Sequence, residues 1–173
     1  MASPGELAIE RAADAEVLVR RSMTKGYQLF SVLTPPIYAA TVLYRRGRAN
    51  FSLNRFLRAT WIGGAVGMAS GGAVEYARVS SSSGETIRRR RISAAYDTDA
   101  LRADDHSTIG AILFAVLTPA ILWKRANVVN LILGGGGLGS SVGILAHYGR
   151  TLSGDPPPRI VLPDILPVPP KGS

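Results

Sequence analysis

Few residues of this 173-residue chain could do chemistry, and they suggest three different kinds of site. Glu75 is an acid inside an otherwise apolar segment, where a carboxyl group is by default a candidate for proton transfer. His106 and His147 are imidazoles, which zinc sites use as ligands. The run Gly134–Gly139 contains G-x-G-x-x-G, the loop pattern that binds a dinucleotide, and Asp155 follows about 20 residues later.

The surroundings of these residues argue against all three sites. A dinucleotide loop is followed by a helix and a second strand, whereas this chain runs into a proline-rich tail. Ser140, rather than lysine, follows Gly139, which also excludes a phosphate-binding P-loop. The chain has no cysteine, and two distant histidines do not make a zinc site. Arg78 lies three residues after Glu75, which favours a helix-end ion pair, with proton transfer as the alternative. We therefore predict no enzyme, cofactor or metal site.

Glycines at four-residue spacing are the more informative pattern, and they occur twice inside apolar segments. In water each glycine in a helix costs about 1 kcal/mol relative to alanine. In a bilayer, where helices gain nothing from hiding apolar surface, small residues at this spacing let two backbones approach closely. We therefore predict that these residues form helix-packing faces: Gly63, Gly67, Gly71, Gly135, Gly139 and Gly143.

The chain has four apolar segments, and two of them contain these glycines. Most of the charged residues lie between the segments. The first segment would be about 27 Å long as a helix, close to the ~30 Å of bilayer hydrocarbon, and Pro35-Pro36 predicts a kink in it. The third segment is short and would need its flanking basic residues to reach the interface. The predicted fold is an all-α membrane protein with four transmembrane helices: Tyr27–Tyr44, Ala59–Ala77, Thr108–Trp123 and Val128–Tyr148.

The two halves of the membrane part repeat each other. Leu29–Ile37 matches Leu113–Ile121 at an offset of 84, and the glycines of Gly63–Gly71 match those of Gly135–Gly143 at an offset of 72. A unit with an even number of spans gives a parallel repeat. We therefore predict a duplicated two-helix hairpin with this organisation: an N-terminal amphipathic, extramembrane segment (1–26, with a short helix over Glu6–Arg21), a first hairpin (27–79), an exposed polar loop (80–107), a second hairpin (108–150) and a proline-rich tail (151–173).

The net charge of +8 fits a partner that carries negative charge. Arginine runs beside apolar segments favour phospholipid over nucleic acid, so we expect no nucleic-acid partner and no small-molecule substrate. Basic side chains next to interfacial aromatics are typical of cardiolipin sites, although ordinary interfacial anchors are an equally good interpretation. Orientation stays open because both sides carry basic residues. The candidate head-group contacts are Arg55, Arg58, Trp61, Trp123, Lys124 and Arg125.

Three stretches together resemble a known family: Leu29–Ile37, Trp61–Arg78 and Ser107–Arg150. With four spans, glycine ladders and paired Thr-Pro motifs, the chain resembles the NUXM-like accessory membrane subunits of fungal mitochondrial respiratory complex I. The resemblance implies a multi-pass protein of the mitochondrial inner membrane in the electron-transport chain. It also implies other membrane-arm subunits as partners, and a role in assembly or stability without catalysis.

The alternative is a component of an inner-membrane translocase of the Tim17/Tim22/Tim23 family, or of a small carrier. That family also has four glycine-rich spans, but its ladders usually lie in the first two spans, whereas here they lie in the second and fourth. A carrier would need polar groups at mid-membrane, and these spans offer only hydroxyls: Thr34, Ser70, Thr118, Ser140 and Ser141.

Overall fold

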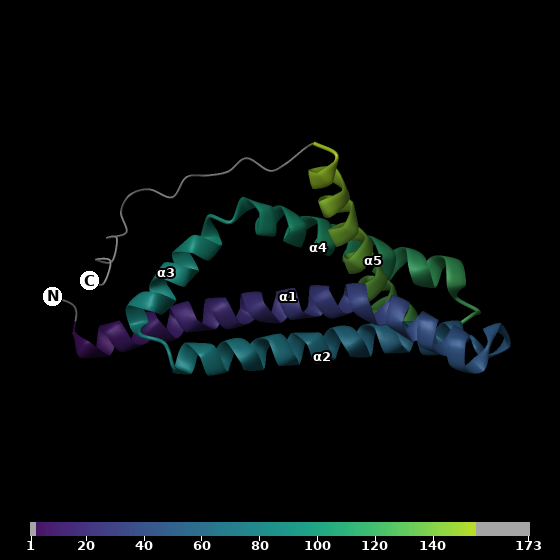
Figure 1. Cartoon of the computed structure of the whole chain (residues 1–173), viewed down its shortest axis with the longest axis horizontal. Coiled ribbons are helices and arrows are strands. Elements are labelled where there is room, and N and C mark those ends of the chain that lie inside the picture. The colour runs from purple at the N-terminus through teal and green to yellow at the C-terminus, as the bar shows by residue number, and fades with distance from the viewer. Residues whose placement is uncertain (1–2, 155–173) are drawn as a thin grey trace.

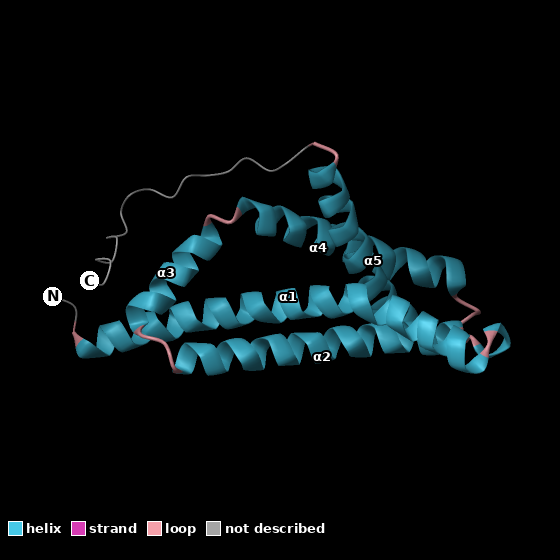
Figure 2. Cartoon of the chain, viewed as in Figure 1, coloured by secondary structure: helices cyan, strands magenta, loops and turns pink. Residues whose placement is uncertain are grey.

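The structure is a computed structural model that describes residues 3–154, and in this range it is entirely helical, without a strand (Figures 1 and 2). Asp155 and nearly all of the predicted proline-rich tail lie outside the described residues. The elements in chain order are α1 (Pro4–Arg46), a 3-10 turn η1 (Arg48–Asn50), α2 (Leu53–Ser80), α3 (Gly84–Ala95), α4 (Thr98–Leu122) and α5 (Val128–Leu152).

Helix α1 corrects the prediction of a short N-terminal helix separate from the first span. It is one helix of 43 residues, roughly 64 Å long, or about twice the hydrocarbon thickness of a bilayer. A capping box starts it: Ser3 Oγ accepts from the Glu6 amide, and the Ser3 amide donates to the Glu6 carboxylate. These hydrogen bonds lower the pKa of Glu6. Gly26 is a weak helix breaker on its own, and Gly47, with φ of 73°, ends the helix.

The segment 80–107 is not the exposed loop that its polar composition predicts. Its residues form α3 and the first turns of α4, with a short connection between them. Ser83 caps α3, and Ile87 is fully buried against Leu18 of α1 and Val79 of α2. The sequence hides this helix because its buried face is small and is interrupted by four consecutive arginines. Helix α3 therefore docks on the N-terminal half of α1.

The long helices form two hairpins, α1 with α2 and α4 with α5, and their most extensive contacts lie within each hairpin (Figure 1). In addition, α5 packs against both α2 and α1, so it lies at the centre of the described fold. Because α4 begins at Thr98, the predicted third span is the apolar end of a 25-residue helix and is not a short element. The three prolines at positions 35, 36 and 119 lie inside helices.

Helices α4 and α5 are long and apolar enough to cross a membrane. The other two long helices are less apolar. Gln28, the tyrosines and the paired prolines lower the hydropathy of α1 over Tyr27–Tyr44, and the glycines and Glu75 lower that of α2. Composition therefore supports two of the four predicted spans directly.

Candidate functional site: the glycine-packed interfaces

The first hairpin is held together by backbone contact at its glycines. A Cβ added to Gly26 of α1 would meet the carbonyl oxygen of Gly67 on α2, and one added to Gly67 would lie 2.6 Å from Phe30 Cβ. A Cβ on Gly71 would lie 2.5 Å from the Ser22 carbonyl oxygen. Real Cβ atoms do not come this close to other heavy atoms, so any side chain at these positions would force the helices apart.

The second hairpin repeats these contacts at the matching positions. A Cβ on Gly110 of α4 would meet the carbonyl oxygen of Gly139 on α5, and one on Gly139 would lie 2.7 Å from Phe114 Cβ. A Cβ on Gly143 would meet the His106 carbonyl oxygen. At offsets of 84 for α1 and 72 for α2, each of these pairs is the counterpart of one in the first hairpin.

The structure thus places all six predicted packing glycines at helix–helix contacts. At the opposite end of each ladder, Gly63 meets the Thr34 side chain, and Gly135 meets that of Thr118. Sequence reasoning missed Gly26 and Gly110, which supply the other half of the closest approach. The signal was available, because these two residues match each other at the offset of 84.

The G-x-G-x-x-G pattern lies inside α5, where its glycines face two different neighbours. Gly135 and Gly139 face α4, whereas a Cβ on Gly134 would lie 2.6 Å from the Leu57 carbonyl oxygen of α2. A Cβ on Gly137 would lie 2.9 Å from Thr60 Cγ2, also on α2. The run of four glycines therefore lets α5 pack closely on two sides at once. It is a packing element within a helix and not a nucleotide-binding loop.

A proline in α1 leaves a backbone carbonyl free to accept a hydrogen bond from the other hairpin. Pro35 has no N–H to donate to the Ser31 carbonyl, the position four residues before it. Ser141 Oγ of α5 donates to this carbonyl oxygen at 2.6 Å. Both residues are buried, so this bond satisfies a backbone group that the helix itself leaves free. Within the second hairpin, Ser107 and Ser140 share a buried hydroxyl–hydroxyl bond of 2.7 Å.

The two interhelical turns meet at one end of the molecule through side-chain amides. Asn54 Oδ1 accepts from the Asn127 amide at 3.0 Å and from Asn130 Nδ2 at 2.9 Å. Trp61 Nε1 in turn donates to Asn130 Oδ1 at 3.0 Å. Trp61, predicted as an interfacial anchor, is therefore half-buried and joins α2 to α5. The other candidate lipid contacts are exposed: Arg55, Arg58, Trp123, Lys124 and Arg125.

Glu75 lies at the other end of α2 and is 4% exposed. Its carboxylate is 3.5 Å from Arg78 Nη1, the partner that the sequence indicates. The shorter contact, 2.6 Å, is to Arg90 Nη2 of α3, which the sequence could not indicate without the docking of that helix. Glu75 is therefore engaged in ion pairs at a helix junction.

His147 is the repeat counterpart of Glu75 and is also buried. Its Nε2 lies 3.0 Å from Asp99 Oδ1 of α4, and its ring centroid is 5.6 Å from that of His106. The fold therefore brings the two histidines together, which the sequence did not suggest. Even so, residues 3–154 contain no group of three or more His, Cys, Asp or Glu side chains that could hold a metal ion.

Comparison with known proteins identified no relative of this chain. No family model, no curated protein and no solved structure matches the chain.

Proposed function

We propose that this chain is a non-catalytic accessory subunit of the membrane arm of mitochondrial respiratory complex I in a fungus, and that it supports assembly and stability of the complex. The proposal that the chain is a membrane subunit is supported by apolar side chains that are exposed at equivalent positions on both hairpins. Three pairs related by the offset of 84 are each between 41 and 74% exposed: Leu29 and Leu113, Leu33 and Leu117, and Ile37 and Ile121.

Large exposed apolar faces are typical of surfaces that meet lipid or other protein subunits. On α4 the face continues through Ile109, Ile112 and Val116. The contacts between α4 and α5 leave this face uncovered, because the glycine ladder uses the opposite side of the helix. The duplicated hairpin thus presents one apolar surface per copy to its surroundings.

We further propose that all four long helices cross the membrane as a duplicated hairpin. Composition supports α4 and α5 directly. For α1 and α2, the support is the set of glycine–carbonyl contacts that the two hairpins share. In this arrangement the two basic turns lie on one side, and α3 and the N-terminal part of α1 lie on the other.

The assignment to complex I rests on the sequence resemblance of Leu29–Ile37, Trp61–Arg78 and Ser107–Arg150. It places the protein in the mitochondrial inner membrane with other membrane-arm subunits as partners. Phospholipid, including cardiolipin, is the expected partner of the exposed basic and aromatic residues around Arg55 and Lys124.

A structural role fits the use of the polar groups better than transport does. Ser140 and Ser141 bond to neighbouring helices, and Ser70 bonds to the carbonyl of Gly67 in its own helix. Thr34 and Thr118 pack against glycines. The hydroxyls that a carrier would need at mid-membrane are therefore used in packing, and the two buried ionisable groups at the helix ends, Glu75 and His147, are paired with Arg90 and Asp99.

The test is native separation of respiratory complexes from mild-detergent extracts of mitochondria, followed by mass spectrometry of each band. We expect the chain in the band that contains the complex I membrane-arm subunits, and less of that band when the chain is deleted. Migration only as a free small oligomer, or with a translocase, would contradict the assignment.

A further inference from the structure

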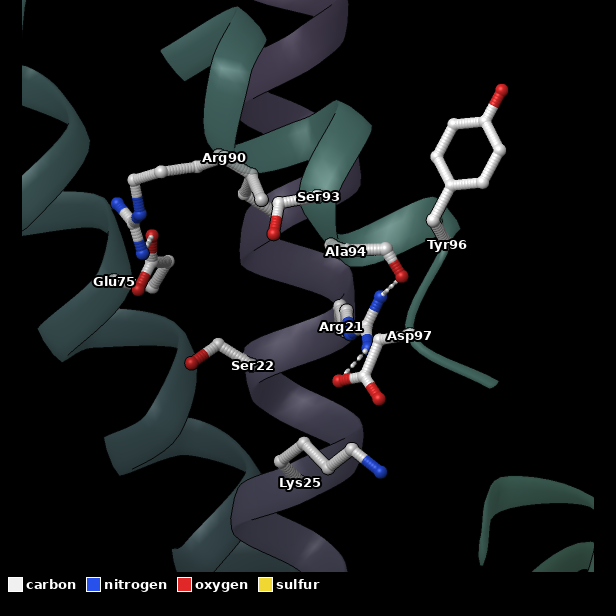
Figure 3. A pocket seen from close by; sticks show the side chains of 10 residues that line it. Arg21, Ser22, Lys25, Glu75, Arg90, Ser93, Ala94, Tyr96 and Asp97 are labelled. Atoms are coloured by element: carbon white, nitrogen blue, oxygen red, sulfur yellow. Dashed lines mark hydrogen bonds and ion pairs between the residues drawn. The ribbon is translucent and has the colours of Figure 1, made fainter. Parts of the chain in front are cut away.

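A pocket of about 550 Å³ lies where α1, α2 and α3 meet, and the charges that line it are balanced within the chain (Figure 3). Each of its cations pairs with an acid: Arg21 with Asp97, Lys25 with Asp104, and Arg90 with Glu75. This pocket therefore does not indicate a charged ligand. A group that lacks its usual partner lies in the second hairpin.

That group is the backbone carbonyl of Ala115 in α4. Pro119, four residues later, has no N–H to donate to it, and no side chain that the structure describes donates to this oxygen. At the matching position of the first hairpin, the Ser31 carbonyl accepts from Ser141 of α5 at 2.6 Å. In a bilayer such a carbonyl needs a donor from protein, because lipid chains offer none.

The surface around this carbonyl is open, whereas its counterpart in the first hairpin is covered. Helix α5 packs over Ser31, Leu57 and Thr60, which are at most 1% exposed. The matching residues of the second hairpin are accessible: Ala115 (half-buried), Val129 (56% exposed) and Ile132 (42% exposed). We call these three residues the open α4–α5 surface. It is an apolar helix-binding surface, with a backbone acceptor in it, that no described helix covers.

We propose that the open α4–α5 surface binds one membrane-spanning helix of another subunit, and that a serine or threonine of this helix donates to the Ala115 carbonyl. Small residues beside that hydroxyl let the helix approach closely, as Gly134 and Gly137 do for α5 on the first hairpin. The inference rests on the proposed function, because it requires a membrane complex, and it names the surface and the chemistry of the partner.

A second copy of this chain does not offer the required donor. Ser141 is already bonded inside the chain, and its counterpart in α2 is Ala69. The exposed hydroxyls of Thr41 and Ser70 donate to carbonyls of their own helices. The donor therefore comes from a different protein.

The first hairpin also has a carbonyl that lost its helical donor to a proline and that needs no partner subunit. Pro36 leaves the carbonyl of Val32 without an N–H from the fourth residue after it. Val32 lines a cavity of about 420 Å³ together with Lys25, Gln28 and Asp99, where water can serve as the donor. The Ala115 carbonyl differs because its surroundings on the open α4–α5 surface are apolar.

The first test identifies what lies on this surface in the assembled complex. The photoreactive residue benzoylphenylalanine is introduced in place of Ile132 in the full chain, and cross-links formed in intact membranes are identified by mass spectrometry. We expect a cross-link to a membrane-spanning segment of another subunit that contains serine or threonine. The matched control is Val142, which is 48% exposed on the same helix and whose counterpart, Ser70, is exposed in the first hairpin. Position 142 should not cross-link to that segment.

The second test concerns the hydrogen bond. Pro119→Ala restores an N–H that can donate to the Ala115 carbonyl within α4. It should lower the amount of cross-linked partner about threefold, as expected for one interhelical hydrogen bond in a membrane. The control Pro36→Ala restores the same kind of bond to Val32 and should leave the amount unchanged.

Cross-links from position 132 only to lipid, or only to a second copy of the chain, would overturn the proposal. Equal amounts of cross-linked partner with Pro119→Ala and Pro36→Ala would exclude the Ala115 carbonyl as the acceptor. A chain that assembles with membrane subunits but cross-links only to lipid refutes this surface alone. A chain absent from membrane complexes refutes the proposed function.

Discussion

The two hairpins share their internal contacts and differ in what surrounds them. Gly26 and Gly67 meet in the first as Gly110 and Gly139 meet in the second. However, the face of α5 that points away from α4 differs from the matching face of α2. Gly134 of α5 corresponds to Ile62 of α2, and this glycine lets α5 approach the α2 backbone. The contacts inside a hairpin are thus common to both hairpins, and the contact between hairpins depends on residues that only one of them has.

The ends of the hairpins differ in the same way. Glu75 of the first pairs with an arginine of α3, whereas its counterpart His147 pairs with Asp99 of α4. Helix α1 also begins ten residues earlier than the repeat requires, because Thr98, the first residue of α4, corresponds to Asp14. Helix α3 packs on Leu18 and pairs with Asp14 of α1, and residues 98–154 of the second hairpin contain no counterpart of it.

The largest expected effect comes from filling a ladder. Gly139→Leu or Gly67→Leu should separate the two helices of a hairpin and lower the amount of assembled protein roughly 5- to 30-fold, because the side chain would overlap a backbone carbonyl. Quantitative blotting of the native complex measures this. The control is Gly149→Leu, where an added Cβ meets nothing within 4 Å. Full assembly of both ladder variants would refute the packing role.

A smaller effect should follow from making the second copy like the first. Gly134→Ile introduces the residue that α2 carries at the equivalent position, and it should weaken the contact between hairpins while each hairpin stays intact. Hydrogen exchange should then rise around Leu57 and Gly134 and stay unchanged around Gly67 and Gly139. Uniform loss of protection would show that the hairpins do not form independently of each other.

Ser141→Ala should cost about 1–3 kcal/mol of stability, because it leaves the carbonyl that Pro35 frees without a donor. Alanine is also what the first copy has at the equivalent position, Ala69. The matched control is Ser70→Ala, which removes a hydroxyl that bonds within its own helix. Thermal unfolding in detergent distinguishes the two variants, and equal midpoints would contradict the importance of this bond.

The smallest effect is a pH dependence at the start of α1, before the part of this helix that α4 matches. Because the capping box lowers the pKa of Glu6, its contribution is present above the ordinary carboxylate pKa and is lost as the pH falls through the lowered value. Amide exchange in the first turn of α1 should therefore rise in acid. Glu6→Gln keeps a hydrogen-bonding side chain and should remove this dependence. The same acid response in Glu6→Gln would exclude the capping box as its cause.

Much of this fold could be predicted from the sequence, because its strongest signals are local. The spacing of Gly63, Gly67 and Gly71 and the repeat offsets identify both packing faces. The sequence did not reveal α3, whose helix depends on a tertiary contact of Ile87, or the partner of Glu75, which depends on where α3 docks. The sequence also did not predict that part of the run Gly134–Gly137 packs against α2, because a glycine pattern does not indicate which neighbouring helix each residue contacts.

The most direct test of the central claim, two matching hairpins that both cross the membrane, uses the absence of cysteine from the chain. Single-cysteine variants at four exposed positions would be labelled in sealed inner-membrane vesicles of both orientations with a membrane-impermeant maleimide: Ala49→Cys, Thr86→Cys, Lys124→Cys and Ser153→Cys. We predict that positions 49 and 124 react from one side and positions 86 and 153 from the other. Reaction of positions 49 and 86 from the same side would contradict the account, because α2 would then not cross the membrane.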